Sequence, residues 1–240
     1  MNNKINLNDI SIPNDNYDES DILKNYSLDK ECIHVYFKDI KNKLIEKINR
    51  YDVILGCVAW LTDFEIIEAL SHKQTAIIVQ KEDFLRPDIN ERGGEKWRRQ
   101  LRNAYNKLKF DYCRFNFNNI MNSLSYATDL SVAPVRCVGN HNREKKSAFP
   151  RMHNKFLIFC NVSNGVIFDE VNCDIIVPKA VWTGSYNFTK NAGLSFENAL
   201  YIEDSDIATA YYNEFGQIAA LSEQLDWESD WVEPEWRIGS

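Results

Sequence analysis

The stretch from residue 51 to residue 80, YDVILGCVAWLTDFEIIEALSHKQTAIIVQ, decides the fold class of this chain. Its first ten residues are a β-branched, apolar run of strand length, and its last six residues form a second run of the same kind. The residues between them have helical apolar spacing, and Thr62 with Glu65 matches the S/T-x-x-E pattern of a capping box. Strand, helix and strand in this order predict a layered α/β fold.

The same alternation continues outward from this stretch in both directions. Residues 35–49 predict a helix with an apolar stripe made of Phe37, Ile40, Leu44, Ile45 and Ile48. Further helices are expected near 95–108 and 207–225, and further strands in VRCVG (135–139), HNKFLIFC (153–160), KAVWTGSYNF (179–188) and ENALYI (197–202). We therefore expect a mostly buried mixed β-sheet flanked by helices on both faces.

Composition divides the chain into one domain and two polar ends. The 240 residues, 44% of them hydrophobic, suffice for one well-buried core, which we place at residues 31–225. Residues 1–30 are rich in Asn and Asp and are expected to form a polar N-terminal arm. Residues 226–240 form an acidic tail with three tryptophans, which is expected to dock either on the domain or on a protein partner.

Targeting and cysteine patterns predict a cytoplasmic protein without stable membrane insertion. No window reaches the roughly 18 uncharged apolar residues of a membrane span, and the first residues lack the features of a signal peptide. The six cysteines contain no C-x-x-C pair, which predicts free thiols and no zinc site. We expect no cofactor.

The net charge of −7 is concentrated at the two ends. Residues 1–31 carry a net charge of −4 and residues 223–240 carry −5, which leaves +2 for the middle of the chain. Two basic stretches there, 96–109 and 136–151, permit a phosphate-bearing partner. The predicted nucleic-acid contacts are Lys96, Arg98, Arg99, Arg102, Arg143, Lys145 and Lys146. Tyr105, Tyr112 and Phe115 are expected either to stack on bases or to lie in the core.

Several polar side chains stand at the ends of the predicted strands. His153 and Lys155 in MHNKFLIF have equal parity, so in an extended strand they lie side by side at the start of an apolar run. In TGSYNFT, Ser185 and Asn187 share a face in the same way, and Glu197 is expected just inside the following strand. An imidazole, an ammonium, a hydroxyl, an amide and a carboxylate together suit a phosphodiester substrate.

The ordered combination H-x-K, G-S-x-N-x-T and E-N-A resembles the phospholipase D superfamily, whose signature is H-x-K-x4-D, then G-S-x-N, then a downstream glutamate. The likeness is best over residues 151–203, and it implies a phospholipase D-like layered domain. Cys160 stands where the motif has its aspartate, and by parity it points away from His153, so we interpret its role as structural. Residues 161–178 lengthen the path between the two motifs, which predicts a hairpin that shapes the rim of the site.

The resemblance implies a role for each motif residue. A histidine of this family attacks phosphorus to give a phosphohistidine, a second histidine protonates the leaving oxygen, and no metal is required. His153 is the candidate for both roles, with Lys155 and Asn187 holding the phosphate oxygens. Ser185 would assist at the phosphate, and Glu197 would orient the imidazole and fix its tautomer.

One chain carries one H-x-K set, whereas the chemistry uses two histidines. His34, His72 and His141 are not followed by a lysine two residues on, although His141 could line the site. We therefore expect a homodimer in which two copies of His153 face each other across a twofold axis. Such a coupled pair predicts a bell-shaped pH profile.

These residues favour a metal-independent phosphodiesterase that acts on nucleic acid, with DNA favoured over RNA. The size and the single motif set resemble the small bacterial nucleases and endonuclease domains of the superfamily. A phospholipid hydrolase using the same site is one alternative, although the sequence contains no amphipathic membrane helix. A non-catalytic dimer that binds phosphates or a protein is the other.

Overall fold

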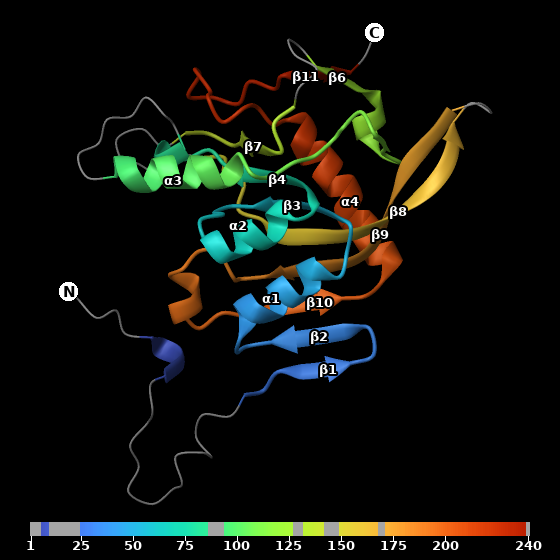
Figure 1. Cartoon of the computed structure of the whole chain (residues 1–240). Coiled ribbons are helices and arrows are strands. Elements are labelled where there is room, and N and C mark those ends of the chain that lie inside the picture. The colour runs from blue at the N-terminus through green and yellow to red at the C-terminus, as the bar shows by residue number, and fades with distance from the viewer. Residues whose placement is uncertain are drawn as a thin grey trace, which may run out of the picture.

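The computed structural model describes residues 6–9, 25–85, 94–126, 132–141, 149–167 and 171–238. These residues form a layered α/β domain (Figure 1). Its elements in chain order are η1 Leu7–Asp9, β1 Leu28–Lys30, β2 Ile33–Tyr36, α1 Ile40–Asn49, β3 Val53–Val58, α2 Phe64–Ser71, β4 Gln74–Gln80, η3 Asp83–Leu85, α3 Glu95–Tyr105, β5 Phe115–Asn116, η4 Ile120–Ser123, β6 Leu124–Tyr126, β7 Val135–Val138, β8 Lys155–Ile167, β9 Val171–Gly184, η6 Ala192–Leu194, β10 Ala199–Ile202, α4 Ser205–Ala220 and β11 Trp236–Ile238.

The strands confirm the predicted mixed sheet. Nine strands of the described residues form one sheet in the order β1-β2-β10-β9-β8-β3-β4-β7, with β5 added beside β9. β4 runs parallel to β3 and β7, whereas β8 is antiparallel to both β3 and β9. The carboxyl ends of β3, β4, β7 and β9 therefore meet the amino ends of β8 and β10 at one edge of the sheet.

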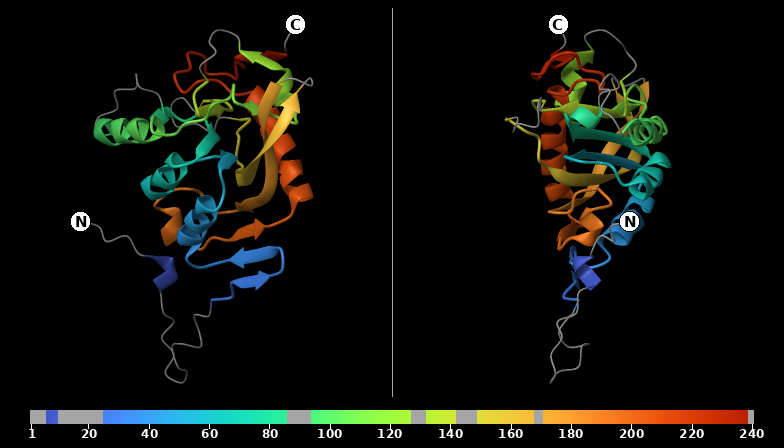
Figure 2. Two further views of the ribbon diagram at one scale, coloured as in Figure 1. Left: turned by 45° about the vertical axis from the view of Figure 1, so that its right-hand side comes forward. Right: turned by 90° about the vertical axis from the view of Figure 1, so that its left-hand side faces the viewer.

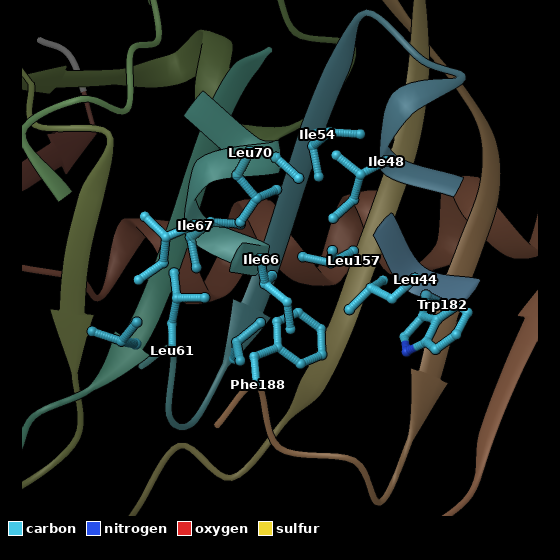
Figure 3. Packing of buried hydrophobic residues seen from close by; sticks show 14 of the residues in the cluster. Leu44, Ile48, Ile54, Leu61, Ile66, Ile67, Leu70, Leu157, Trp182 and Phe188 are labelled. Carbon is cyan, nitrogen blue, oxygen red and sulfur yellow. The ribbon is translucent and has the colours of Figure 1, made fainter. Parts of the chain in front are cut away.

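Helices cover both faces of this sheet, as predicted. α1, α2 and α3 lie on one face and α4 lies on the other (Figure 2). Under α1 and α2, Ile48 and Leu70 lie beside Ile54 of β3 (Figure 3). Under α4, Phe215 belongs to the same buried cluster as Leu55. Successive residues of a strand face opposite ways, so the apolar run of β3 supplies both layers at once.

Helix α2 begins one residue later than the capping box predicted. The Asp63 carboxylate accepts hydrogen bonds from the backbone N–H groups of Glu65 and Ile66 at 3.0 and 3.3 Å, so Asp63 is the N-cap. Thr62 instead donates its backbone N–H to the carbonyl of Phe188 at 2.8 Å, which holds it in the chain segment before the helix. The capping box centred on Thr62 was therefore wrong.

The strands β1 and β2 and the helix α1 also differ in their bounds from the predicted N-terminal elements. β1 already starts at Leu28, inside the predicted arm, and pairs with β2. β2 occupies the first residues of the predicted helix, and α1 starts only at Ile40, after Asp39 takes a left-handed conformation with φ 55°. The packing of Tyr36 stabilises β2 at this position, because the Tyr36 ring stacks on the buried Trp182 with centroids 5.6 Å apart. Phe37 is exposed and lies outside the apolar stripe.

The C-terminal tail docks on the domain. Trp227 and Trp236 are buried, whereas Trp231 is 69% exposed. The strand of Trp236, β11, pairs antiparallel with β6. Arg136, which belongs to the second basic stretch of the sequence, is buried and bound to Glu235 at 2.9 Å. That arginine is therefore part of the interior and not of a basic surface.

The long hairpin of β8 and β9 is confirmed, but not its predicted place at the rim. Pairing continues from Asn161 opposite Val177 to Ile167 opposite Val171. The register of the β8–β9 pair shifts between Phe159 and Cys160, and Cys160 lies opposite Pro178. A proline is tolerated there because the hydrogen-bond ladder is interrupted. The thirteen residues of β8 place its last residue, Ile167, about 40 Å along the strand from Lys155 at the polar end.

The aromatic residues proposed for base stacking lie in the core. Tyr105, Tyr112 and Phe115 are all buried. Tyr105 donates its hydroxyl to the carbonyl of Leu61 at 2.5 Å, and Tyr112 packs on Phe110 with ring centroids 4.5 Å apart. The core interpretation of these residues is correct and the stacking interpretation is wrong.

Breaking one buried ion pair should destabilise the domain strongly. Lys81 and Glu223 are both buried and form an ion pair, so Lys81→Met leaves a carboxylate buried without its cation. We expect the free energy of unfolding in urea to fall by about 3–5 kcal/mol at pH 7. Lys107→Met is the matched control, because the Lys107–Glu68 pair is exposed and should change the stability little.

The loss of unfolding free energy caused by Lys81→Met should become smaller as the pH is lowered. Burial raises the pKa of the Glu223 carboxyl even though Lys81 acts in the opposite direction. Removal of the lysine raises that pKa further, and a carboxyl with a raised folded-state pKa binds its proton more tightly when folded. A deficit that grows toward acidic pH would contradict this account.

Candidate active site

The segment before β8 is fixed where β3 and β4 end. Met152 donates its backbone N–H to Oε1 of Gln80 at 2.8 Å, and Ala59 donates its N–H to the carbonyl of Asn154 at 2.8 Å. These bonds place His153 beside Trp60, two residues after the end of β3, and the Trp60 ring meets the imidazole edge-on with centroids 5.6 Å apart.

His153 and Lys155 lie side by side, as the parity argument predicted. Nζ of Lys155 is 3.3 Å from Nδ1 and 3.4 Å from Nε2 of His153, and it donates to the His153 carbonyl at 3.0 Å. The His153 side chain is exposed and Lys155 is half-buried. The ammonium and the imidazole can therefore both reach one small anionic group at this edge.

The surroundings favour the neutral imidazole of His153. Burial lowers the pKa of the His153 imidazole, and the charges of Lys155 and Arg151 lower it further. Burial also lowers the pKa of the Lys155 ammonium, while Glu197 acts in the opposite direction. A neutral imidazole has a free lone pair and can act as a nucleophile.

Glycine is required where β9 turns toward the site. A Cβ on Gly184 would lie 2.3 Å from the carbonyl oxygen of Asn198, so only glycine allows this close approach of backbones. The approach lets Ser185 donate its backbone N–H to that same carbonyl at 3.1 Å. The G-S pair thereby joins the end of β9 to the segment before β10.

The Ser185 hydroxyl forms hydrogen bonds with other groups of the same chain. It donates to Oε2 of Glu197 at 2.5 Å and accepts the backbone N–H of Asn198 at 3.0 Å. Its only hydrogen is therefore directed at Glu197. The geometry makes Ser185 a positioning residue for that carboxylate, and assistance at the phosphate stays a prediction.

Glu197 and Asn187 line the same pocket. Glu197 lies two residues before β10, not inside the strand as predicted, and within one chain it makes no hydrogen bond to His153. The expected orienting contact to the imidazole is thus missing between these two described residues. Asn187 also lines the pocket, and its Oδ1 is buried without a hydrogen-bond partner.

Cys160, at the position of the motif aspartate, lies on the face of the sheet that α4 covers. It is fully buried with Phe156 and Ile158, whereas Leu157 and Phe159 face the other layer with Lys155. Burial raises the pKa of the Cys160 thiol. The structure supports the structural role predicted for this residue.

The predicted nucleic-acid contacts divide into three groups. Lys96 and Arg99 are exposed on α3, and Arg98 is half-buried there. Arg102 instead bonds to the Leu85 and Leu225 carbonyls and to the carboxylate of Asp226, so it ties α3 to the C-terminal tail. The remaining predicted contacts lie outside the described residues, namely Arg143, Lys145 and Lys146.

The other histidines have structural surroundings. Nε2 of the buried His141 lies 2.9 Å from Oδ1 of Asp83, and its ring packs on Trp227, so it does not line the site. His34 bonds to Asp29 at 2.8 Å in the β1–β2 hairpin. His72 is exposed at the end of α2.

A pocket of about 510 Å³ adjoins the site, and sequence reasoning missed its aromatic wall. Trp60, Phe84 and Trp97 form this wall. The signal available for Trp60 was its position at the end of the apolar run 51–60. No comparable signal marks Phe84 and Trp97, because they come from different segments that only the fold brings together.

The described residues contain neither a cluster of metal ligands nor a membrane-spanning helix. No group of three or more His, Cys, Asp or Glu side chains there could hold a metal ion. No helix in those residues is both long and apolar enough to cross a bilayer.

Comparisons with known proteins identify relatives of the chain. A family model described as cardiolipin synthase, PLD-like domain, matches residues 120–219, which include all five predicted catalytic residues. The uncharacterized protein L381 of Acanthamoeba polyphaga mimivirus is 34% identical over 238 residues, covering 94% of this chain and 75% of the viral protein.

Two solved structures are similar over most of the chain. NucT from Helicobacter pylori has a TM-score of 0.47 and 13% identity, covering 79% of this chain and 96% of its own. Nuc from Salmonella typhimurium, a phospholipase D family member, has a TM-score of 0.44 and 18% identity, covering 80% and 95%.

The pKa of His153 should lie below the usual value of about 6.5 and should rise in Arg151→Gln. Removing a nearby positive charge favours the protonated imidazole, so the direction is upward, and added salt should weaken the change. An NMR titration of the imidazole protons measures both values. Lys43→Gln on α1, a matched loss of one exposed cation, should leave the His153 pKa unchanged. A downward shift in Arg151→Gln would contradict the assignment.

Proposed function

Because the chain belongs to the phospholipase D superfamily, we propose that it is a metal-independent phosphodiesterase that cleaves nucleic acid through a phosphohistidine at His153. The observation that carries this proposal is the contact between His153 and Lys155, in which the ammonium lies 3.3 and 3.4 Å from the two ring nitrogens. A nucleophile and a phosphate-binding cation thus occupy the same strand end, with the lone-pair form of the imidazole favoured.

In the first step, a ring nitrogen of His153 attacks phosphorus. The new N–P bond forms as the bond from phosphorus to the leaving oxygen breaks, and the protonated His153 of a second copy gives its proton to that oxygen. Lys155 and the amide of Asn187 hold the non-bridging oxygens as their charge grows. One well-placed donor of this kind contributes about 3–4 kcal/mol to stabilisation of the transition state.

In the second step, water replaces the enzyme on phosphorus. The now neutral imidazole of the second copy takes a proton from the water, whose oxygen bonds to phosphorus as the N–P bond breaks. Both histidines return to their starting forms. Because one imidazole must be neutral and the other protonated, kcat/KM should be bell-shaped in pH.

A homodimer is part of this proposal because a single chain supplies one H-x-K set. His34, His72 and His141 lie away from the site, so a second copy is the natural source of the second imidazole. Glu197 keeps a second carboxylate oxygen beyond its bond with Ser185, and with it Glu197 can orient the imidazole of that copy.

Nucleic acid is the substrate class that the charges support best. Lys96 and Arg99 are exposed on α3, the helix that also brings Trp97 to the pocket beside His153. Contacts of such residues with phosphates make binding fall as salt is raised. DNA is favoured over RNA in this proposal.

Cleavage in excess EDTA tests the reaction. Wild-type protein should cut labelled single- or double-stranded DNA or RNA under chelation, and His153→Ala should lose all measurable cleavage because the nucleophile is gone. Lys155→Met should lower kcat by about 100- to 1,000-fold, since it removes one oxyanion donor. His72→Ala, a histidine exposed at the end of α2, is the matched control and should keep full activity.

The outcome of this assay separates the candidate functions. Activity that requires added metal, or that persists in His153→Ala, would rule out the histidine mechanism. Hydrolysis of phospholipid vesicles without any cleavage of nucleic acid would favour the lipid-hydrolase alternative. Binding of phosphates without turnover on either substrate would favour the non-catalytic dimer.

A heterodimer with one intact His153 tests the composite site. Wild-type and His153→Ala chains carrying different tags are co-expressed, and the mixed dimer is isolated on both tags. If each turnover uses both copies of His153, the mixed dimer should be inactive. If each chain works alone, it should keep about half of the wild-type activity, which would disprove the shared site.

A further inference from the structure

The pocket beside His153 has a wall built from three aromatic residues of separate elements. Trp60 follows β3, Phe84 lies in η3, and Trp97 lies on α3. The rings of Phe84 and Trp97 meet edge to face with centroids 5.7 Å apart, and Trp60 meets His153 at 5.6 Å. The wall therefore begins at the proposed nucleophile and extends to α3.

These rings expose apolar surface that the fold does not cover. Trp97 is 38% exposed, and Trp60 and Phe84 are half-buried. Nε1 of Trp60 donates to Oε1 of Glu82 at 3.1 Å, so the polar end of the indole is satisfied and its orientation is set. Aromatic surface that lines a concave site is a common feature of ligand pockets.

Polar groups face the aromatic wall across the pocket. They come from the G-S-x-N loop, the residues after it and the start of the α2 segment: Thr62, Asn187, Thr189, Asn191, Ser195 and Glu197. Among them, Oδ1 of Asn187 is buried and lacks a partner. A ring stacked on the aromatic wall would place its polar edge toward these groups. The volume of about 510 Å³ lies within the range of small-molecule sites.

We propose that this pocket binds the base of a nucleotide that flanks the scissile phosphate. The proposal rests on the proposed function and deepens it by assigning the residues that hold the substrate next to the reacting bond. Lys96 and Arg99 are exposed on the same helix as Trp97 and would contact the phosphates that follow the bound base. A quaternary ammonium headgroup also suits aromatic rings, but these cations would repel it.

The first test measures base binding without any reaction. The intrinsic fluorescence of the full-length wild-type protein, excited at the red edge of tryptophan absorption, is titrated with AMP and with ribose 5-phosphate. Both ligands carry the same phosphate, so the difference reports the base. We expect AMP to quench more strongly, and we expect Trp97→Phe, which keeps a stacking ring, to bind AMP with less quenching.

The second test measures cleavage of oligonucleotides that carry one abasic site on either side of the cut bond. Loss of the stacked base should lower kcat/KM about 5- to 150-fold for the wild type. Trp97→Ala should lower kcat/KM on the intact strand by a similar factor and remove the preference for the base. Trp97→Phe should recover most of the activity, and Lys96→Ala should weaken both substrates equally.

The two tests fail in different ways. Equal cleavage of intact and abasic strands, with equal quenching by AMP and ribose 5-phosphate, would overturn the base pocket and leave the nuclease proposal standing. Absence of cleavage would overturn the proposed function, and the AMP titration would still decide whether the pocket takes a base. Quenching by phosphocholine in place of AMP would overturn the base assignment in favour of a lipid headgroup.

Discussion

The site depends on the register of β8 between β3 and β9. Lys155 lies opposite Val58, and Phe156 lies opposite Thr183, so the amino end of β8 comes to the edge where both neighbours end. Strand side chains alternate between faces, and a slip of one residue would exchange Lys155 with a core position. Buried residues on both faces of β8 make such a slip costly, because Leu157 and Ile158 would each meet the wrong layer. The packing of the core therefore sets the position of the reactive groups.

The buried side chain of Gln80 fixes the segment that precedes β8. Gln80 accepts the backbone N–H of Met152 at 2.8 Å and donates to the carbonyls of Lys81 and Asn140 at 3.0 and 3.1 Å. It thereby joins the ends of β4 and β7 to the segment that contains the histidine. Gly139 makes room for it, with φ 94° and a Cβ position only 2.5 Å from the Gln80 oxygen. The geometry of the site is thus maintained by the same contacts that close the edge of the sheet.

The sequence predicted what local patterns determine. Strand, helix and strand from residue 51 to 80 appeared as expected, and equal parity correctly placed His153 beside Lys155. Local patterns did not predict the distant partners of individual side chains. The hydrogen of Ser185 goes to Glu197, twelve residues later, and Arg102 binds the tail rather than a surface ligand. The aromatic pocket could not be predicted because its walls come from elements that are separated in the chain and become neighbours only after folding.

An acidic chain can offer a basic surface where its charges are unevenly distributed. Glu223 and Glu235 neutralise Lys81 and Arg136, two bases that the tail helps to bury. Each pair cancels one acid with one base and leaves the net charge of −7 unchanged, so the sign near the site depends on where the remaining charges lie, and most of the excess acid lies in residues 1–31 and 223–240. On α3 the balance is reversed, since Lys96 and Arg99 stay exposed beside the pocket. The local field at the edge of the sheet, and not the sum over the chain, decides whether a polyanion can approach His153.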